Sequence, residues 1–213
     1  MKSIKINLNK SIDDPLYGKS KWWGRADLPE GMAYPMEHYD DGEDDPLTLV
    51  CQIRCADLTP YDTKNQLPHE GMLYFFADID EYVEAMGEVG ESEFQNSLGE
   101  WEPEAYRVLY SPTEQGLNTH TITDPDGEPA NLPAESLSFE VADDHYDSFK
   151  LLGKPYYEEI QELYPDHLCL LQIDENDEWG LRLYDCGMIC FLIRPEDLKA
   201  LDFSKVKVYF HSF

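Results

Sequence analysis

The hydrophobic positions along the chain form one pattern that occurs twice. The first copy, within 47–77, is an apolar segment ending in Gln-Ile, then a polar stretch, then a Gly-Met that opens a second apolar segment. The second copy, within 168–193, has the same order. Apolar runs of this length between polar turns are typical of buried strands. We therefore predict two internally duplicated β-β units, and a superposition that places Gln52 on Gln172.

The rest of the pattern predicts further strands and few helices. In the first unit, Leu49 and Val50 point to opposite faces of one strand, so that strand is expected to be central and covered on both sides. Alternation also predicts strands at 2–8 and 137–141, while 195–200 is typical of a short helix with Pro at its first turn. The 213 residues predict one domain, 1–213, of the α+β class, strand-dominated, with short covering helices.

Charge changes this picture most. The chain has 44 acidic and 16 basic residues and a formal net charge of -28. Such a field repels nucleic acids and anionic membranes and attracts basic proteins or peptides, although solubility alone is the more common explanation of a high net charge. No apolar run has the length of a membrane span, and the N-terminus lacks an apolar signal segment. An odd number of cysteines, five, favours reduced thiols, so a cytoplasmic protein is expected, with a monomer favoured.

Five motifs occur in an order that resembles the YwqG-like family, bacterial proteins of unknown function. They are Trp-Gly-Arg-Ala-Asp-Leu-Pro at 23–29, Pro-Leu-Thr-Leu-Val-Cys-Gln-Ile at 46–53, Leu-Pro-His-Glu-Gly-Met-Leu-Tyr-Phe-Phe at 67–76, Leu-Leu-Gln-Ile-Asp at 170–174, and Asp-Leu with Asp-Phe-Ser within 197–204. The resemblance implies an α+β fold with an internal duplication, and no established activity or catalytic residue. The chain departs from the family pattern at Trp23 and Ala26, and an insertion after Gly180 opens a Trp-Gly-Asp-x-Gly turn.

No metal, cofactor or catalytic residue is predicted. Cysteines recur with a Cys-x3-Cys spacing at 51–55 and 186–190, but residues four apart on a strand are separated by roughly 13 Å, too far to share one ion. The acidic loops at 40–45 and 124–128 lack the full set of calcium ligands. The chain also lacks the local motifs of activated nucleophiles and of phosphate-binding loops.

Aromatic and amide side chains are the candidates for binding. Trp22 and Trp23 lie beside Arg25, and these residue types are common interface anchors; the alternative is that they fill the core. The two repeat glutamines either line a groove across a pseudo-twofold axis or satisfy backbone groups. The candidate binding residues are Trp22, Trp23, Arg25, Gln52, Gln172, Asp174 and Trp179.

Two functions remain open at this point. The first is a non-enzymatic acidic binding or adaptor protein for a basic protein partner, such as a cationic toxin that it neutralises. The second is an enzyme whose active site lies in a cleft between the two repeats, with Asp174 as an acid or base and an unknown reaction. A deep pocket with two carboxylates would favour the enzyme, and a broad acidic face would favour the binding protein.

Overall fold

The structure is a computed structural model that describes residues 2–10, 14–38, 42, 44–83, 98–123, 126–178, 180–184 and 186–212. Strands make up 43% of these residues and helices 12%. This confirms the prediction of a strand-dominated chain with few short helices. Among these residues, no helix is long and apolar enough to cross a membrane.

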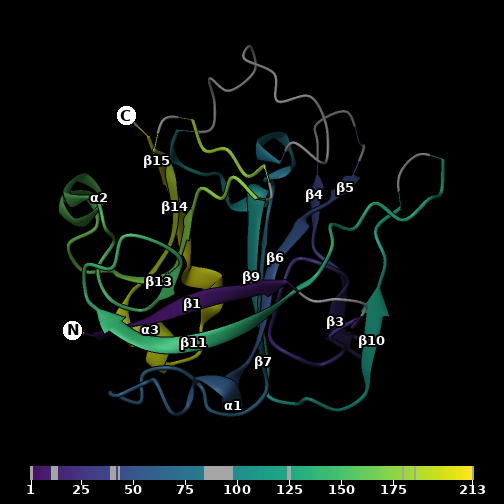
Figure 1. Cartoon of the computed structure of the whole chain (residues 1–213), viewed down its shortest axis with the longest axis horizontal. Helices are drawn as coiled ribbons and strands as arrows, with labels where there is room; N and C mark the ends of the chain where they lie inside the picture. The colour runs from purple at the N-terminus through teal and green to yellow at the C-terminus, as the bar shows by residue number, and fades with distance from the viewer. Residues whose placement is uncertain are drawn as a thin grey trace.

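The elements follow one another in the order that Figure 1 labels. The strands are β1 (Lys2–Lys10), β2 (Lys21–Trp22), β3 (Ala26–Pro29), β4 (Met36–His38), β5 (Asp44–Pro46), β6 (Thr48–Arg54), β7 (Met72–Ala77), β8 (Gly99–Glu100), β9 (Tyr106–Ser111), β10 (Leu117–His120), β11 (Glu135–Asp143), β12 (Lys150–Leu151), β13 (Leu168–Asp174), β14 (Met188–Ile193) and β15 (Lys207–His211). The helices are α1 (Cys55–Leu58), α2 (Glu158–Leu163) and α3 (Pro195–Lys199), with 3-10 turns η1 (Asp80–Tyr82), η4 (Pro103–Ala105) and η5 (Phe203–Lys205).

Eleven of these strands form one sheet in the order β8-β15-β14-β13-β12-β1-β11-β2-β6-β7-β9. The middle of the sheet is the long antiparallel pair β1 and β11, which runs from Lys2 opposite Asp143 to Lys10 opposite Glu135. In Figure 1 this pair crosses the front of the molecule, with β13 to β15 on one side and β6 and β7 on the other. The two predicted β-β units are therefore separate arms of a single sheet.

The two arms have the same strand pairing. β6 pairs with β7 and β13 pairs with β14, both antiparallel, and Gln52 and Gln172 each lie opposite the third residue of the partner strand. β6 and β13 each have one irregularity in register, which ends at the residue before the glutamine. On the other side, Gln52 lies opposite Lys21 of β2, and Gln172 lies opposite Lys150 of β12. The arms thus present equivalent residues in equivalent places.

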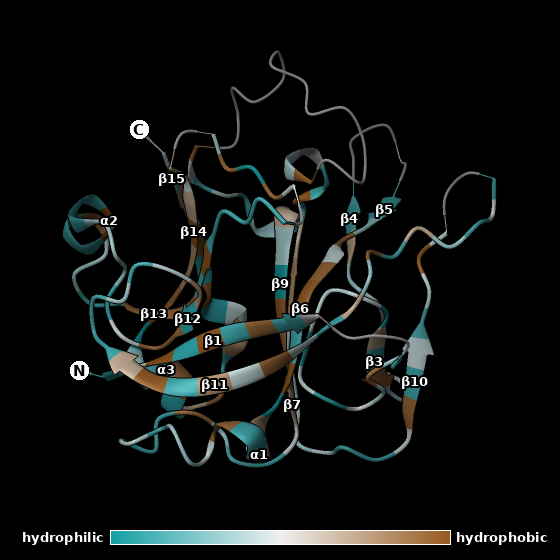
Figure 2. Ribbon diagram, in the orientation of Figure 1, coloured by the Kyte–Doolittle hydropathy of each residue, from teal (hydrophilic) through white to brown (hydrophobic). Residues whose placement is uncertain are grey.

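The sheet curls until its far ends approach each other. The Tyr106 hydroxyl of β9 donates to the Val206 carbonyl at 3.0 Å. The backbone N–H of Trp101, which follows β8, donates to the Val208 carbonyl of β15 at 2.9 Å. The rings of Phe75 and Phe191, one from each arm, meet edge to face with centroids 5.5 Å apart. The main hydrophobic core fills the inside of the curl, and Figure 2 shows the hydrophobic colour gathered on β6, β7, β13 and β14.

Smaller elements cover the outer faces of both arms. The two-stranded sheet of β3 and β10 lies on the first arm, where Leu28 packs with Leu49 and Phe76. On the second arm Ile160 of α2 packs with Cys169 and neighbouring apolar residues of β13 and β14. Strands β6, β7, β13 and β14 are buried on both faces, as the apolar residues on both sides of the predicted strand indicated.

Glycine opens the second strand of each arm because the backbone leaves no room for a side chain. A Cβ at Gly71 would lie 1.9 Å from the Ser111 carbonyl oxygen, and Gly71 has a positive φ of 81°. A Cβ at Gly187 would lie 1.7 Å from the Leu183 carbonyl oxygen. The Gly-Met signal in the sequence therefore marks a close approach between backbones in both arms.

Candidate functional site

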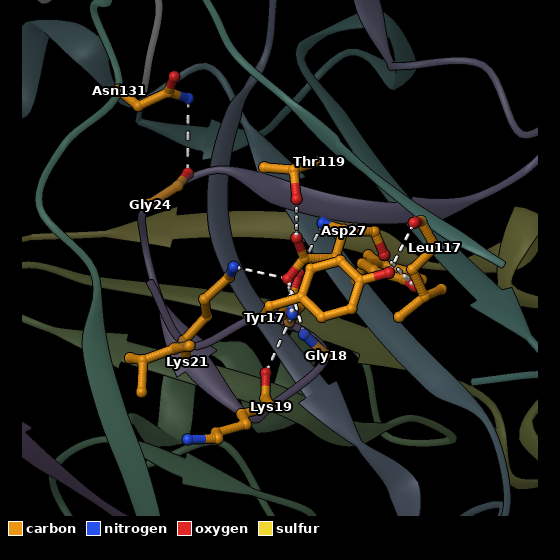
Figure 3. A network of polar contacts seen from close by, with 12 residues as sticks. Tyr17, Gly18, Lys19, Lys21, Gly24, Asp27, Leu117, Thr119 and Asn131 are labelled. Carbon is orange, nitrogen blue, oxygen red and sulfur yellow. Dashed lines mark hydrogen bonds and ion pairs between the residues drawn. The ribbon is translucent and has the colours of Figure 1, made fainter. Parts of the chain in front are cut away.

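A buried polar network of the first arm is centred on Asp27 of β3, whose carboxylate is 1% exposed (Figure 3). Its Oδ2 accepts hydrogen bonds from the Lys21 ammonium at 2.7 Å and from the Gly18 N–H at 3.0 Å. Its Oδ1 accepts the Thr119 hydroxyl of β10 at 2.7 Å. The carboxylate therefore joins three segments of the chain: the loop before β2, β2 itself and β10.

Gln52 completes this network from β6. Its Nε2 donates to Asp27 Oδ2 at 2.9 Å and to the Lys19 carbonyl at 3.0 Å, while its Oε1 accepts the Asp27 N–H at 2.9 Å. The Tyr74 hydroxyl donates to the Asp27 carbonyl at 2.7 Å. Burial lowers the pKa of the Lys21 ammonium from its usual value, and the hydrogen bond to Asp27 opposes that shift.

These contacts assign the network a structural role. The Asp27 carboxylate is buried and both of its oxygens are occupied by donors, so no lone pair faces solvent for acid-base chemistry. Sequence analysis did not single out Asp27, Lys21 or Thr119. Lys21 and Asp27 are close in the chain, but their burial depends on segments that are distant in sequence, such as β10 with Thr119. The sequence did point to Asp27 in one way, because this residue lies within the first family motif.

Trp22 and Trp23 pack beneath this network and are 0% and 3% exposed. The ring of Trp22 meets Phe149 edge to face, with centroids 5.3 Å apart. Both indoles belong to the main core, which agrees with the core-filling alternative. Neither ring is presented to solvent, and a binding role for either one stays a prediction.

Arg25, by contrast, is exposed and lines a pocket of about 640 Å³ together with Gly24, Thr119 and Asn131. The Asn131 amide donates to the Gly24 carbonyl at 3.5 Å, which ties the pocket wall to the loop (Figure 3). Among the described residues, Arg25 has no ion-pair partner. The segment 21–25 therefore combines buried indoles with one exposed guanidinium.

In the second arm, Gln172 makes the same type of contacts as Gln52. Its Oε1 accepts the Tyr156 N–H at 3.0 Å, and its Nε2 donates to the Ser148 carbonyl at 2.8 Å. Tyr156 follows Lys150 by the same number of residues as Asp27 follows Lys21, so Tyr156 takes the place of Asp27. In the same way, Ser148 precedes Lys150 as Lys19 precedes Lys21. Both glutamines thus satisfy backbone groups of a neighbouring loop, and both are 0% exposed. These contacts agree with the backbone alternative rather than with a groove lined by amides.

Lys150 is buried at the place of Lys21, but it has different neighbours. Its ammonium donates to the Asp144 carbonyl at 3.1 Å, and no carboxylate lies within ion-pair distance among the described residues. Burial lowers the pKa of Lys150 from its usual value, while Cys169 and Cys190 act in the opposite direction. In the first arm the Asp27 carboxylate neutralises the lysine. In the second arm this carboxylate is absent because Tyr156 replaces Asp27.

Asp174, at the end of β13, lies among other carboxylates. Burial raises the pKa of the Asp174 carboxyl from its usual value, and the nearby carboxylates of Glu175 and Asp147 raise it further. Hydrogen bonds from the Glu175 N–H, at 2.9 Å, and from Ser148 act in the opposite direction. We call the surface formed by Asp147, Asp174 and Glu175 with Tyr156 and Tyr157 the acidic face.

Metal binding finds no support in the part of the chain that the structure describes, where no group of three or more His, Cys, Asp or Glu side chains could hold an ion. The five cysteines are free thiols, and burial raises the pKa of Cys55 to about 12. Trp179 and parts of the two acidic loops, at 40, 41, 43, 124 and 125, lie outside the described residues. Their predicted roles stay predictions.

A family model described as a domain of unknown function, DUF1963, matches residues 20–154 and, in a second match, residues 121–211. The chain belongs to the DUF1963 family. This is the YwqG-like family that the five motifs resemble, so the prediction of family membership is confirmed. No curated protein matches the chain. The DUF1963 family assigns no activity to Asp27, Gln52 or their counterparts, and their roles rest on the contacts described above.

Proposed function

We propose that this DUF1963 protein is a non-enzymatic binding protein that engages a basic protein or peptide, such as a cationic toxin, through the acidic face. The chain supplies the long-range attraction, because its formal net charge is -28. The observation that carries the proposal is the acidic face itself. Among the described residues, Asp147, Asp174 and Glu175 have no Lys, Arg or His within ion-pair distance.

The electrostatics of Asp174 support a cationic ligand. Its pKa is raised because a partly buried carboxylate lies near two others, so ionising all three together costs free energy. A Lys or Arg side chain placed among them would lower that pKa and gain charge-assisted hydrogen bonds. Tyr156 and Tyr157, whose rings meet edge to face with centroids 5.2 Å apart, add aromatic surface for a cation.

One carboxylate at the junction of the two arms, Glu100, is not suited to act as a general acid. Glu100 of β8 lies at this junction, and a general acid there would need a raised pKa. The pKa of Glu100 is instead lowered, first by the hydrogen bond from Lys207 at 2.6 Å and then by the Tyr164 hydroxyl at 2.6 Å. This carboxylate is held as an anion by its partners, which suits a structural ion pair.

The proposal is tested with an oligolysine peptide as the probe, measured by isothermal titration calorimetry at low and at moderate salt. The variant D147N/D174N/E175Q is expected to weaken binding about tenfold or more, because each charged contact contributes about 1.5–3 kcal/mol. The control variant E30Q/E70Q/E196Q removes the same charge from three exposed positions away from the acidic face. It is expected to weaken binding only slightly, through the general field.

Equal losses in the two variants would contradict the proposal, because the peptide would then respond to net charge and not to the acidic face. Affinity that does not fall between low and moderate salt would contradict the electrostatic part, since the Debye length shortens to about 10 Å at 0.1 M. Capture from cell extract with the same two variants then identifies the basic partner.

We also infer that the two arms arose by internal duplication. The support is the equal pairing around Gln52 and Gln172, the buried lysines opposite them, and the glycines that open β7 and β14. The number of residues between the buried lysine and the glutamine differs between the two arms. This is expected when loops change length and strands do not. A cytoplasmic location is part of the proposal, because the cysteines are free thiols.

A further inference from the structure

A groove of about 520 Å³ lies where the far ends of the curled sheet meet. Its wall on one side comes from β8, η4 and β9, and on the other side from η5 and β15. β9 and β15 hold the same place in the two arms, because Val108 pairs with Phe75 and Val208 pairs with Phe191. The groove therefore lies at the seam between the arms, and its volume is in the range of roughly 300–1,000 Å³ that small-molecule sites occupy.

Basic side chains gather at this groove although the chain as a whole is strongly acidic. Arg107, Lys205 and Lys207 all line it, out of 16 basic residues in the chain. Lys207 is neutralised by Glu100 at 2.6 Å, and Glu102 is the other carboxylate of the wall. Arg107 and Lys205 are exposed, and within the described ranges neither has an ion-pair partner. Two cations without fixed counter-charges thus share one groove.

Part of the groove lining is apolar and held in place by contacts with the core. Trp101 is 7% exposed, and its ring meets Phe210 edge to face. Its backbone N–H donates to the Val208 carbonyl at 2.9 Å. Phe203 and Val206 are also buried, and the Val206 carbonyl accepts the Tyr106 hydroxyl. Apolar side chains and two cations in one groove lining suit an anionic group attached to an apolar body.

We propose that this seam groove binds a small organic anion, with its carboxylate or phosphate between Arg107 and Lys205 and its apolar body against Trp101. Arg offers a planar fork of donors that matches both kinds of anion, and Lys adds a second point charge. This goes beyond the proposed function, because the ligand has the opposite charge and binds at a different place from the acidic face.

The test uses phenyl phosphate and benzoate as probes, with benzyl alcohol as the neutral analogue. Two-dimensional ¹H–¹⁵N NMR of the whole chain follows the indole N–H of Trp101 and the amides of Val108 and Val206. At least one of the anionic probes is expected to shift these signals in a saturable way in the millimolar range, and benzyl alcohol is not. The stronger of the two anions identifies the charged group of the natural ligand.

The variant R107Q/K205Q is expected to weaken the binding of the anionic probe by about tenfold or more, since each lost charge-assisted hydrogen bond contributes about 1.5–3 kcal/mol. The matched control K64Q/K154Q removes two exposed lysines elsewhere and is expected to leave the affinity unchanged. Shifts that benzyl alcohol reproduces, equal losses in both variants, or no saturable shift with either anion would each overturn the proposal. All variants lie at exposed positions, so the dispersion of the spectrum reports whether the fold is retained.

Discussion

Lys21 and Lys150 occupy the same position in the two arms of the sheet, but within the described part of the chain only Lys21 has a carboxylate at ion-pair distance. In the first arm Asp27 accepts the ammonium at 2.7 Å, inside a network that includes Gln52 and Thr119. In the second arm the place of Asp27 is taken by a tyrosine, and the Lys150 ammonium meets a backbone carbonyl at 3.1 Å. Both lysines are almost fully buried, at 1% and 0% exposure.

The comparison separates what the local fold requires from what one arm has added. Gln52 and Gln172 keep the same backbone contacts in both arms, so these hydrogen bonds define how the loop joins the strand. The ion pair is present in only one arm, so it is not needed to bury a lysine at this position. Its effect on stability must therefore differ between the arms, and the following measurements test that difference.

The largest expected effect comes from Asp27→Asn. This change removes the charge that compensates the buried Lys21, which costs about 3–5 kcal/mol of the free energy of unfolding, measured by urea denaturation. The matched control at the equivalent position is Tyr156→Phe, which is expected to change stability by under about 0.5 kcal/mol. Equal losses at the two positions would show that the ion pair contributes nothing specific to the first arm.

The next expected effect is a difference in sign between the two lysines. Lys21→Met leaves the Asp27 carboxylate buried without its cation and is expected to cost about 3 kcal/mol. Lys150→Met removes an amine with no counter-ion and is expected to leave stability unchanged or to raise it. Burial lowers the pKa of Lys150 below 10.5 in the folded chain. As the pH rises toward 10.5, Lys150 is therefore protonated to a greater extent in the unfolded chain than in the folded chain. The wild type should therefore gain stability relative to Lys150→Met over that range, which denaturation at several pH values measures.

Substitution of the two glutamines is expected to have a moderate and similar effect. Gln52→Leu and Gln172→Leu each leave a backbone N–H and a backbone carbonyl without partners, which costs about 1–3 kcal/mol. Each glutamine donates a second hydrogen bond, Gln172 to the Tyr146 carbonyl at 3.2 Å and Gln52 to the Asp27 carboxylate at 2.9 Å. Gln52→Leu should cost about 1 kcal/mol more, because a hydrogen bond to a charged carboxylate is stronger than one to a carbonyl. Hydrogen exchange at the amides of Asp27 and Tyr156 would locate each effect. If protection at both amides is retained, the glutamines do not define the loops.

The smallest expected effect concerns Asp174. The pKa of its carboxyl is raised in the folded chain, so the protonated form is favoured there and stability falls as the pH rises through that pKa. At neutral pH, Asp174→Asn should therefore raise the free energy of unfolding by under about 1 kcal/mol. NMR titration should show the pKa of Asp174 falling in the variants E175Q and D147N. A pKa that stays constant in both would mean that burial alone sets it.

Local pattern predicted the strands of both arms, but not how they join. The runs that end at Gln52 and Gln172 and the glycines before β7 and β14 were recognised, because buried strands have a continuous apolar signal. Alternation also predicted strands near β1 and β11. It could not predict that these two pair with each other along their whole length, since alternation identifies the faces of a strand and not its neighbour.

The site was harder to predict for the same reason. The equivalence of Lys21 and Lys150 is invisible in the sequence, because the chain between each lysine and its glutamine has a different length. Trp22 and Trp23 were singled out for binding, whereas both are buried, and Trp22 packs against Phe149, which is distant in sequence. α2 was not predicted at all, because a helix this short carries only one buried residue, Ile160.

The pairing of β1 with β11 also constrains how the chain is made. β1 lies between β11 and β12 in the sheet, so this strand has neither neighbour until residues 135–151 leave the ribosome. At synthesis rates of about 5–20 residues per second, this interval is on the order of ten seconds. During that time β1 is an unpaired strand with one apolar face, which carries Ile4 and Ile6. Chaperones that hold nascent chains act on segments of this kind, and a circular permutant that begins after β1 would remove the delay.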